Sequence, residues 1–218
     1  MIPSERAAGT IDRRHAATDR ATYVTIGARR FVGIDGIGSP ASDDFRFALD
    51  PLRRAEEGAR QRLAKRLPAD DRRDLHPAVP ECIWWHPDLA LPDDLVRQID
   101  DRSAWHWRQL IELPVRATED EVSEAIDDAA RIAGRVRPLT RLVRLTEGPA
   151  AQILHRGVSA TIAPSLRRLY DDVLSAGAVP GRTIHEVRVG DERIVPGDRA
   201  HLILRIPIEV APATTPGS

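Results

Sequence analysis

The order of the expected helices and strands most constrains this fold, because the same order occurs twice. A strand signal at 23–36 precedes a helix from about Asp43, followed by strand signals at 81–87 and 103–114. The order returns as strands at 142–146 and 150–157, a helix from Pro164, and strands at 183–189 and 201–208. Two strand-helix-strand-strand units predict an α+β fold in which one curved antiparallel sheet carries helices on one face and a ligand cleft on the other.

The expected elements form a single domain over residues 21–210. Its pseudo-repeats cover about 21–117 and 138–210, and a helix at 118–134 joins them. Thr118 and Glu121 have the spacing of a capping box at the start of that helix. Residues 1–20 show no apolar period and are expected to be a flexible lead, and the small residues of 211–218 are expected to be disordered.

Composition excludes several classes of function. The 218 residues are 42% hydrophobic, and 32 basic residues balance 33 acidic ones, which argues against a nucleic-acid partner. No apolar run reaches the length of a membrane span and the N-terminus lacks a signal-peptide core, so we expect no membrane partner and a cytoplasmic location. Cys82 is the single cysteine and the histidines lack ligand spacing, so we expect neither a metal nor a cofactor.

An acid lies in the middle of the apolar-flanked strand at 183–189. Side chains alternate along a strand, so Glu186 and Arg188 share one face while His185 and Val187 share the other. Either Glu186 pairs with Arg188 or a cross-strand arginine on a solvated face, or it is an unpaired carboxylate of a functional site. The strand alone leaves both interpretations open.

Four tryptophans fall in two close pairs, which are Trp84 with Trp85 and Trp105 with Trp107. Indoles beside an acid suit a bulky aromatic or cationic guest, but aromatic stripes also pack helices against sheets. Trp105 and Trp107 share a face of their strand, so both belong to the core or both line the cleft.

Several short stretches, in this order, resemble the GyrI-like small-molecule-binding domain. They are 31–38, Ile83-Trp84-Trp85, Trp105-His106-Trp107, Glu147-Gly148, 152–157, His185-Glu186-Val187 and Leu204-Arg205-Ile206-Pro207. The resemblance covers about residues 22 to 209. It implies a duplicated fold around a central cleft, with Glu186 facing a hydrophobic, often cationic, aromatic ligand.

Stand-alone members of this family resemble the chain in layout and hydrolyse the cyclopropane of DNA alkylators of the yatakemycin and duocarmycin type. The resemblance therefore implies a self-resistance hydrolase in which Glu186 activates water. Arg188, on the same face of the strand, is the candidate donor to the dienone oxygen. The residues expected to contact the ligand are Trp84, Trp85, Trp105, Trp107, Gln152, Ser159, Glu112 and Glu147.

The chain departs from the family pattern at two positions, where Ser159 and Arg188 stand in place of tyrosines. Arg188 beside Glu186 either supplies a donor or neutralises the acid, which weakens the expectation of a cationic ligand. The alternative functions are a module that binds aromatic small molecules without turnover and an inhibitor of a topoisomerase. We expect a monomer or a weak dimer.

Overall fold

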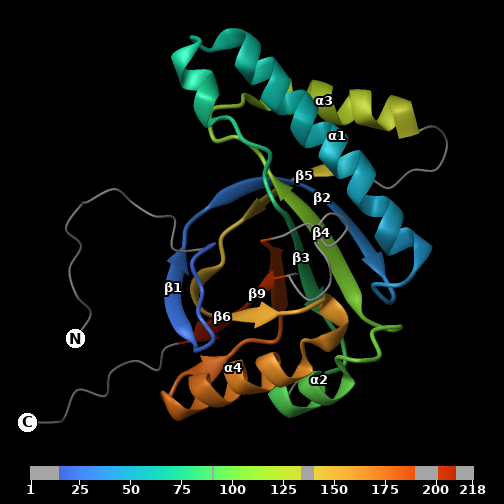
Figure 1. The fold of residues 1–218 in the computed structure, drawn as a ribbon. Helices are drawn as coiled ribbons and strands as arrows, with labels where there is room; N and C mark the ends of the chain where they lie inside the picture. Colours follow the sequence, from blue (N-terminus) through green and yellow to red (C-terminus); the bar gives the residue numbers. More distant parts are fainter. Residues whose placement is uncertain (1–14, 90, 134–139, 190–200, 210–218) are drawn as a thin grey trace, which may run out of the picture.

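The computed structural model describes residues 15–89, 91–133, 140–189 and 201–209 (Figure 1). The helices are α1 (Asp43–Arg66), α2 (Pro92–Gln98), α3 (Glu119–Ala133) and α4 (Ala163–Ser175), with short 3-10 turns at η2 (Asp70–Asp74) and η3 (Ser159–Thr161). The strands are β1 (Thr22–Ile26), β2 (Arg29–Ile37), β3 (Pro80–Trp85), β4 (His106–Glu112), β5 (Arg141–Leu145), β6 (Gly148–Arg156), β7 (Val179–Pro180), β8 (Ile184–Arg188) and β9 (His201–Glu209).

These strands form a nine-stranded antiparallel sheet in the part of the chain that the structure describes. Its order is β1-β6-β9-β8-β3-β4-β2-β5, and β7 pairs with β9. The two halves repeat the same unit, β2-α1-β3-β4 and β6-α4-β8-β9, and they meet where β3 pairs with β8. This arrangement confirms the predicted α+β fold.

Each half also supplies an edge strand to the other half. β1 immediately precedes β2 but pairs with β6, and β5 immediately precedes β6 but pairs with β2. The halves are therefore interlocked through β1 and β5 as well as joined at the centre of the sheet.

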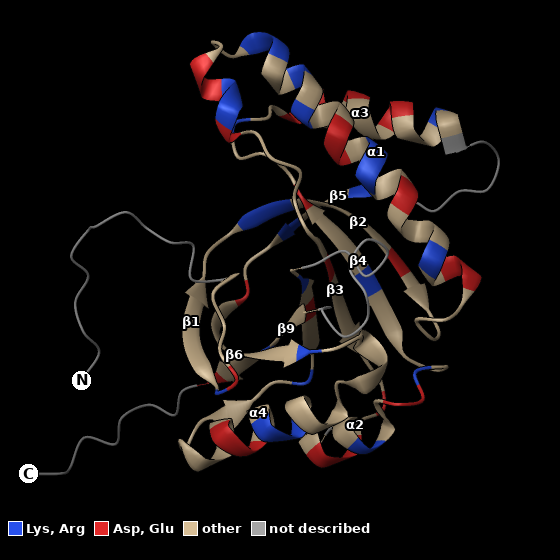
Figure 2. Ribbon diagram, viewed as in Figure 1, with Lys and Arg blue, Asp and Glu red and all other residues tan. Residues whose placement is uncertain are grey.

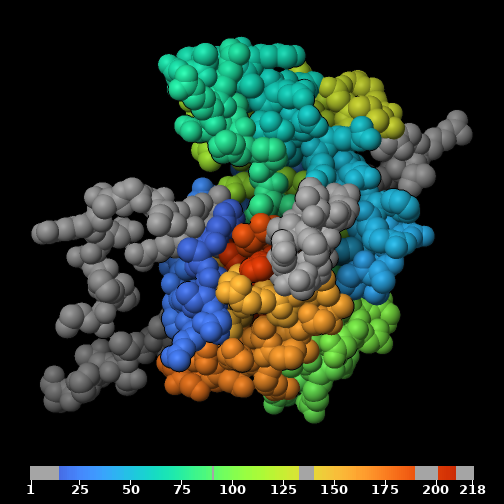
Figure 3. Space-filling model, in the orientation of Figure 1, coloured from blue at the N-terminus to red at the C-terminus, as the bar shows by residue number. Residues whose placement is uncertain are grey.

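Helices cover one face of this sheet. α1 packs with α3 against the first half, and α4 packs with α2 against the second (Figure 1). Apolar side chains from both halves form one core on this face, including Val32, Leu52, Trp84, Leu166 and Leu204. The opposite face carries a much smaller cluster of Phe31, Leu110 and Val143. In Figure 3 the red atoms of β9 are visible between β1 and the orange segment of the second half.

The α1 helix begins as its sequence predicts, because the Ser42 hydroxyl accepts a hydrogen bond from the Phe45 amide at 3.3 Å. Pro51 and Gly58 lie inside it without ending it. Gly58 allows α3 to pack closely, since a Cβ on this residue would lie 3.1 Å from the Ala125 Cβ. Glycine is therefore useful here despite its low helix propensity.

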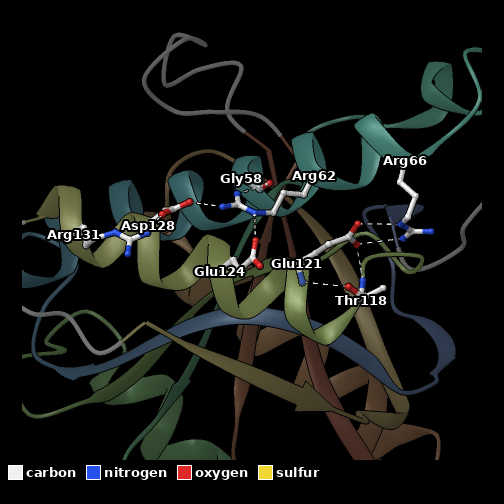
Figure 4. Close-up of polar contacts among 8 residues, drawn as sticks. All are labelled: Gly58, Arg62, Arg66, Thr118, Glu121, Glu124, Asp128 and Arg131. Carbon is white, nitrogen blue, oxygen red and sulfur yellow. Dashed lines mark hydrogen bonds and ion pairs between the residues drawn. The ribbon is translucent and has the colours of Figure 1, made fainter.

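Charged side chains join α1 to α3 along their solvent edge (Figure 4). Arg62 contacts Glu124 at 3.1 Å and also pairs with Asp128. The predicted capping box is confirmed, since Thr118 and Glu121 exchange hydrogen bonds of 2.8 and 3.2 Å between amides and side chains.

Other expectations are met in part. The end of the expected N-terminal lead, residues 1–20, lies along β6, where Leu154 donates its amide to the Thr18 carbonyl at 2.7 Å. The last residue of the expected helix at 118–134 and the expected disordered tail at 211–218 lie outside the described residues.

Surface charges of both signs alternate along the helices rather than gathering by sign (Figure 2). No helix in the described ranges has the length and apolar character needed to cross a membrane.

Candidate functional site

The pleat of the strands divides the predicted site residues between the two faces of the sheet. On the helix-covered face lie Trp84, Trp107, Glu186 and Arg188, together with Ser159 from η3. On the helix-free face lie Trp85, Glu112, Glu147 and Gln152. The structure therefore does not bring the predicted residues together in one cavity.

Glu186 lies in a buried ion pair on the helix-covered face. Its Oε1 accepts a hydrogen bond from Arg102 Nη1 at 2.7 Å, and the Ser159 hydroxyl donates to its Oε2 at 2.8 Å. The exposed fractions of the Glu186 and Arg102 side chains are 0% and 3%. Arg102 also stacks on Trp84, with its Cζ 4.6 Å from the ring centroid. Arg102 thus neutralises Glu186, whereas the sequence had suggested Arg188 as a possible partner.

Arg188 extends toward α1 instead of toward Glu186. Its Cζ lies 5.6 Å from the Phe45 ring, and its buried Nε has no hydrogen-bond partner among the described residues. Phe45 stacks on Trp84 at 5.0 Å and meets the edge of Trp107 at 5.2 Å. The tryptophans of this face therefore pack α1 against the sheet.

Trp105 also belongs to the core. It is fully buried, and its ring lies 5.9 Å from that of His86. The expectation that Trp84, Trp105 and Trp107 line an open cleft is corrected, because helices cover the face on which they lie.

A cleft of about 430 Å³ opens on the helix-free face. Its apolar walls are Ile83 and Trp85 of β3, Leu145 and Pro207. Its polar groups are Arg108, Thr146, Glu147, Thr183 and His185. Of the predicted site residues, Trp85 and Glu147 line this cleft and Glu186 does not. The cleft is where the fold class predicted it, but its acid is Glu147.

Glu147 belongs to a charged network beneath the cleft. Its Oε2 lies 2.8 Å from His185 Nδ1, and its Oε1 accepts a hydrogen bond from Arg205 at 2.7 Å. On the other side of the imidazole, His185 Nε2 forms an ion pair with Glu81 at 2.9 Å. Gln152 accepts a hydrogen bond from Arg205 Nε at 3.0 Å. These partners orient Glu147 and leave its side chain 11% exposed.

Opposite charges set the protonation of this network. Burial alone would raise the pKa of Glu147, but His185 and Arg205 outweigh burial and lower it to about 2. Burial alone would lower the pKa of His185, but Glu147 and Glu81 raise it to about 9. At neutral pH the site therefore holds a carboxylate beside an imidazolium.

Glu112 lies in a separate cavity of about 550 Å³, between the C-terminal part of α1, η2 and the adjoining ends of β3 and β4. Glu56 and Glu81 also line this cavity. Within the described ranges, no group of three or more histidine, cysteine, aspartate or glutamate side chains is placed to hold a metal ion.

Sequence reasoning missed five charged residues at these sites, which are Glu81, Arg102, Arg108, His185 and Arg205. Glu81 shares its face of β3 with Trp85, and Arg108 lies on the same face of the neighbouring strand β4. The alternation of side chains along each strand could therefore have indicated both residues. Arg102 follows α2 in an irregular segment, so neither period nor motif indicated its contact with Glu186.

Among the comparisons with known proteins, only solved structures support the fold. No family model matches the chain, and no curated protein matches it.

Similar solved structures include an uncharacterized conserved protein from Listeria innocua, with a TM-score of 0.75 and 21% identity over 91% of this chain and 97% of that one. A hydrolase from Listeria innocua has a TM-score of 0.74 and 20% identity over 91% and 96% of the two chains. The EcmrR C-terminal domain has a TM-score of 0.50 and 10% identity over 87% and 97%. At these identities the likeness concerns the fold alone, and it agrees with the predicted α+β fold of one curved antiparallel sheet.

Proposed function

We propose that this chain is a cofactor-independent hydrolase that adds water to the cyclopropane of a bulky aromatic DNA-alkylating compound, detoxifying it. One observation carries the proposal: an indole wall and an ionised, partly exposed carboxylate meet in one open cleft. The resemblance of the sequence to the GyrI-like family supplies the reaction. Trp85 stacks on the flat polycycle, and Glu147 orients the water.

The reaction needs little basicity from Glu147. As the water oxygen bonds to the exposed methylene, the strained carbon–carbon bond breaks, and its electron pair moves through the dienone to give a phenolate. The attacking water becomes strongly acidic as its oxygen–carbon bond forms, so a carboxylate of low pKa can still accept its proton. Glu147 then releases this proton to solvent, a proton from solvent neutralises the phenolate, and the product equals the substrate plus one water.

Binding without turnover is the second candidate, and a specific observation favours it. Both oxygens of Glu147 are already engaged, one by Arg205 and one by His185. If these contacts leave no room for a catalytic water, the cleft is a binding site only.

Mass spectrometry of a spirocyclopropyl-dienone alkylator incubated with catalytic amounts of protein separates these candidates. Conversion of many equivalents to the water adduct supports the hydrolase, whereas unchanged compound that quenches tryptophan fluorescence supports binding alone.

Matched variants then test which acid acts. We expect Glu147→Gln to lower turnover by at least about 100-fold while the protein stays folded. Loss of turnover in a folded Glu186→Gln protein, with Glu147→Gln fully active, would move the chemistry to the helix-covered face.

A further inference from the structure

Arg108 and Trp85 form one wall of the cleft. They come from neighbouring antiparallel strands, and the Arg108 Cζ lies 6.0 Å from the Trp85 ring centroid. The Arg108 side chain is 30% exposed. A guest that stacks on Trp85 is therefore within reach of a guanidinium at the same wall.

Two ionic neighbours hold Arg108 in this position. Asp35 on β2 accepts from Arg108 Nε at 2.5 Å and from Nη2 at 3.2 Å, and it also pairs with Arg141. Burial raises the pKa of Asp35, but the two arginines outweigh burial and lower it, so Asp35 is ionised. Among the described residues, one carboxylate serves two guanidiniums here, so this group carries one more positive charge than negative.

The network beneath the cleft does not cancel that charge. Two acids, Glu147 and Glu81, are matched by two bases, since His185 pairs with both acids and Arg205 pairs with Glu147. Among the described groups of this network and of the Asp35, Arg108 and Arg141 cluster, positive groups outnumber negative ones by one. Its field therefore opposes a cationic guest and favours an oxygen acceptor or an oxyanion.

We infer that Arg108 is the specificity-determining residue of this cleft and that it selects planar aromatic guests carrying an oxygen acceptor or oxyanion over organic cations. Asp35 is its positioning residue. The inference rests on the proposed function, and it gives the cleft a donor for the oxygen on which negative charge develops.

Calorimetric titration with two probes that share one flat ring tests the inference, using naphthalenesulfonate as the anion and (naphthylmethyl)trimethylammonium as the cation. We expect the anion to bind the wild-type protein at least about tenfold more tightly. Arg108→Gln should remove most of this preference. The conservative variant Arg108→Lys keeps the charge without the fork that Asp35 holds, and it should retain part of the preference.

Arg141→Gln is the matched control, because it removes the same single positive charge beside Asp35 from a residue that does not line the cleft, and so separates the position of the charge from its amount. It should preserve the preference for the anion better than Arg108→Gln does, and circular dichroism verifies that each variant is folded. Equal or tighter binding of the cation to the wild type overturns the inference and leaves the proposed cleft standing. If Trp85→Ala leaves the binding of both probes unchanged, or if neither probe binds, the cleft itself is overturned.

Discussion

Two neighbouring residues of β8 belong to separate ionic clusters. Glu186 points under the helices and pairs with Arg102, whereas His185 points to the opposite face between Glu147 and Glu81. Each cluster is buried, so each charge depends on its partner for stability. The two clusters can be tested separately because they lie on opposite faces of the sheet.

Glu186→Gln should destabilise the protein, because it leaves the Arg102 guanidinium buried without a counter-charge. We expect the free energy of unfolding, measured by urea denaturation, to fall by about 3 to 5 kcal/mol. Glu209→Gln, at an exposed position, is the control and should change little. Replacing both Arg102 and Glu186 by Met should recover much of the loss. A single-variant cost below about 1 kcal/mol would show that the pair is not desolvated.

The network of His185 predicts how stability varies with pH. The pKa of Glu147 is lowered from 4.5, so its contribution is present above pH 4.5 and is lost as the pH falls toward 2. The pKa of His185 is raised from 6.5, so its contribution is complete below pH 6.5 and is lost as the pH rises through 9. These two groups should therefore stabilise the fold most between pH 4.5 and 6.5.

Thermal unfolding measured from about pH 5 to pH 10 checks this expectation. His185→Gln should remove most of the decline in melting temperature between pH 6.5 and 9, while His76→Gln, at an exposed position, should leave it in place. An unchanged decline in the His185 variant would assign the effect to other groups.

At the scale of elements, the pairing of β2 with β4 depends on a missing side chain. Gly36 lies opposite Trp107, and a Cβ on Gly36 would lie 2.1 Å from the indole ring. Trp107 is fully buried and packs edge-on against the Phe45 ring. The glycine is therefore required by the tryptophan and not by its own backbone angles.

Gly36→Ala should lower the free energy of unfolding by about 1 to 3 kcal/mol, because the ring must shift within a packed core. Gly27→Ala is the matched control, since a Cβ there meets no atom within 4 Å. Chemical denaturation of both variants provides the comparison. If Gly36→Ala and Gly27→Ala are equally stable, Trp107 and α1 can shift to accommodate the added methyl group at little cost.

At the scale of the whole molecule, the exchange of edge strands makes the two halves interdependent. β1 of the first half pairs with β6, and β5 pairs with β2. The core on the helix-covered face is also continuous across the halves. We therefore expect the pseudo-repeats to form one cooperative unit over 21–210.

A fragment of residues 1–137 should not fold alone, because it would expose the β3 edge that pairs with β8 and leave β1 without β6. Circular dichroism should show no cooperative thermal transition for the fragment and one transition for the whole chain. A cooperative transition in the fragment would contradict the interlocked arrangement.

Much of this architecture was predictable because its signals are local. Alternation and turn residues located the strands, Ser42 and the Thr118 capping box located two helix starts, and the repeated element order predicted one curved antiparallel sheet. The partition between site and core was not predictable in the same way. Trp84 and Trp85 carry the same local signal, yet one packs under α1 and the other lines the cleft.

The sequence by itself determined that Glu186 and His185 point in opposite directions, because the pleat of a strand alternates its side chains. Only the tertiary structure decided which direction is covered. That depends on the side of the sheet on which α1 and α4 pack, and on the register that places Cys82 beside Glu186 and Arg205 beside His185. Both the packing side and the register are set by long-range contacts that bury the whole apolar face. As a result Glu147, and not Glu186, lines the open cleft.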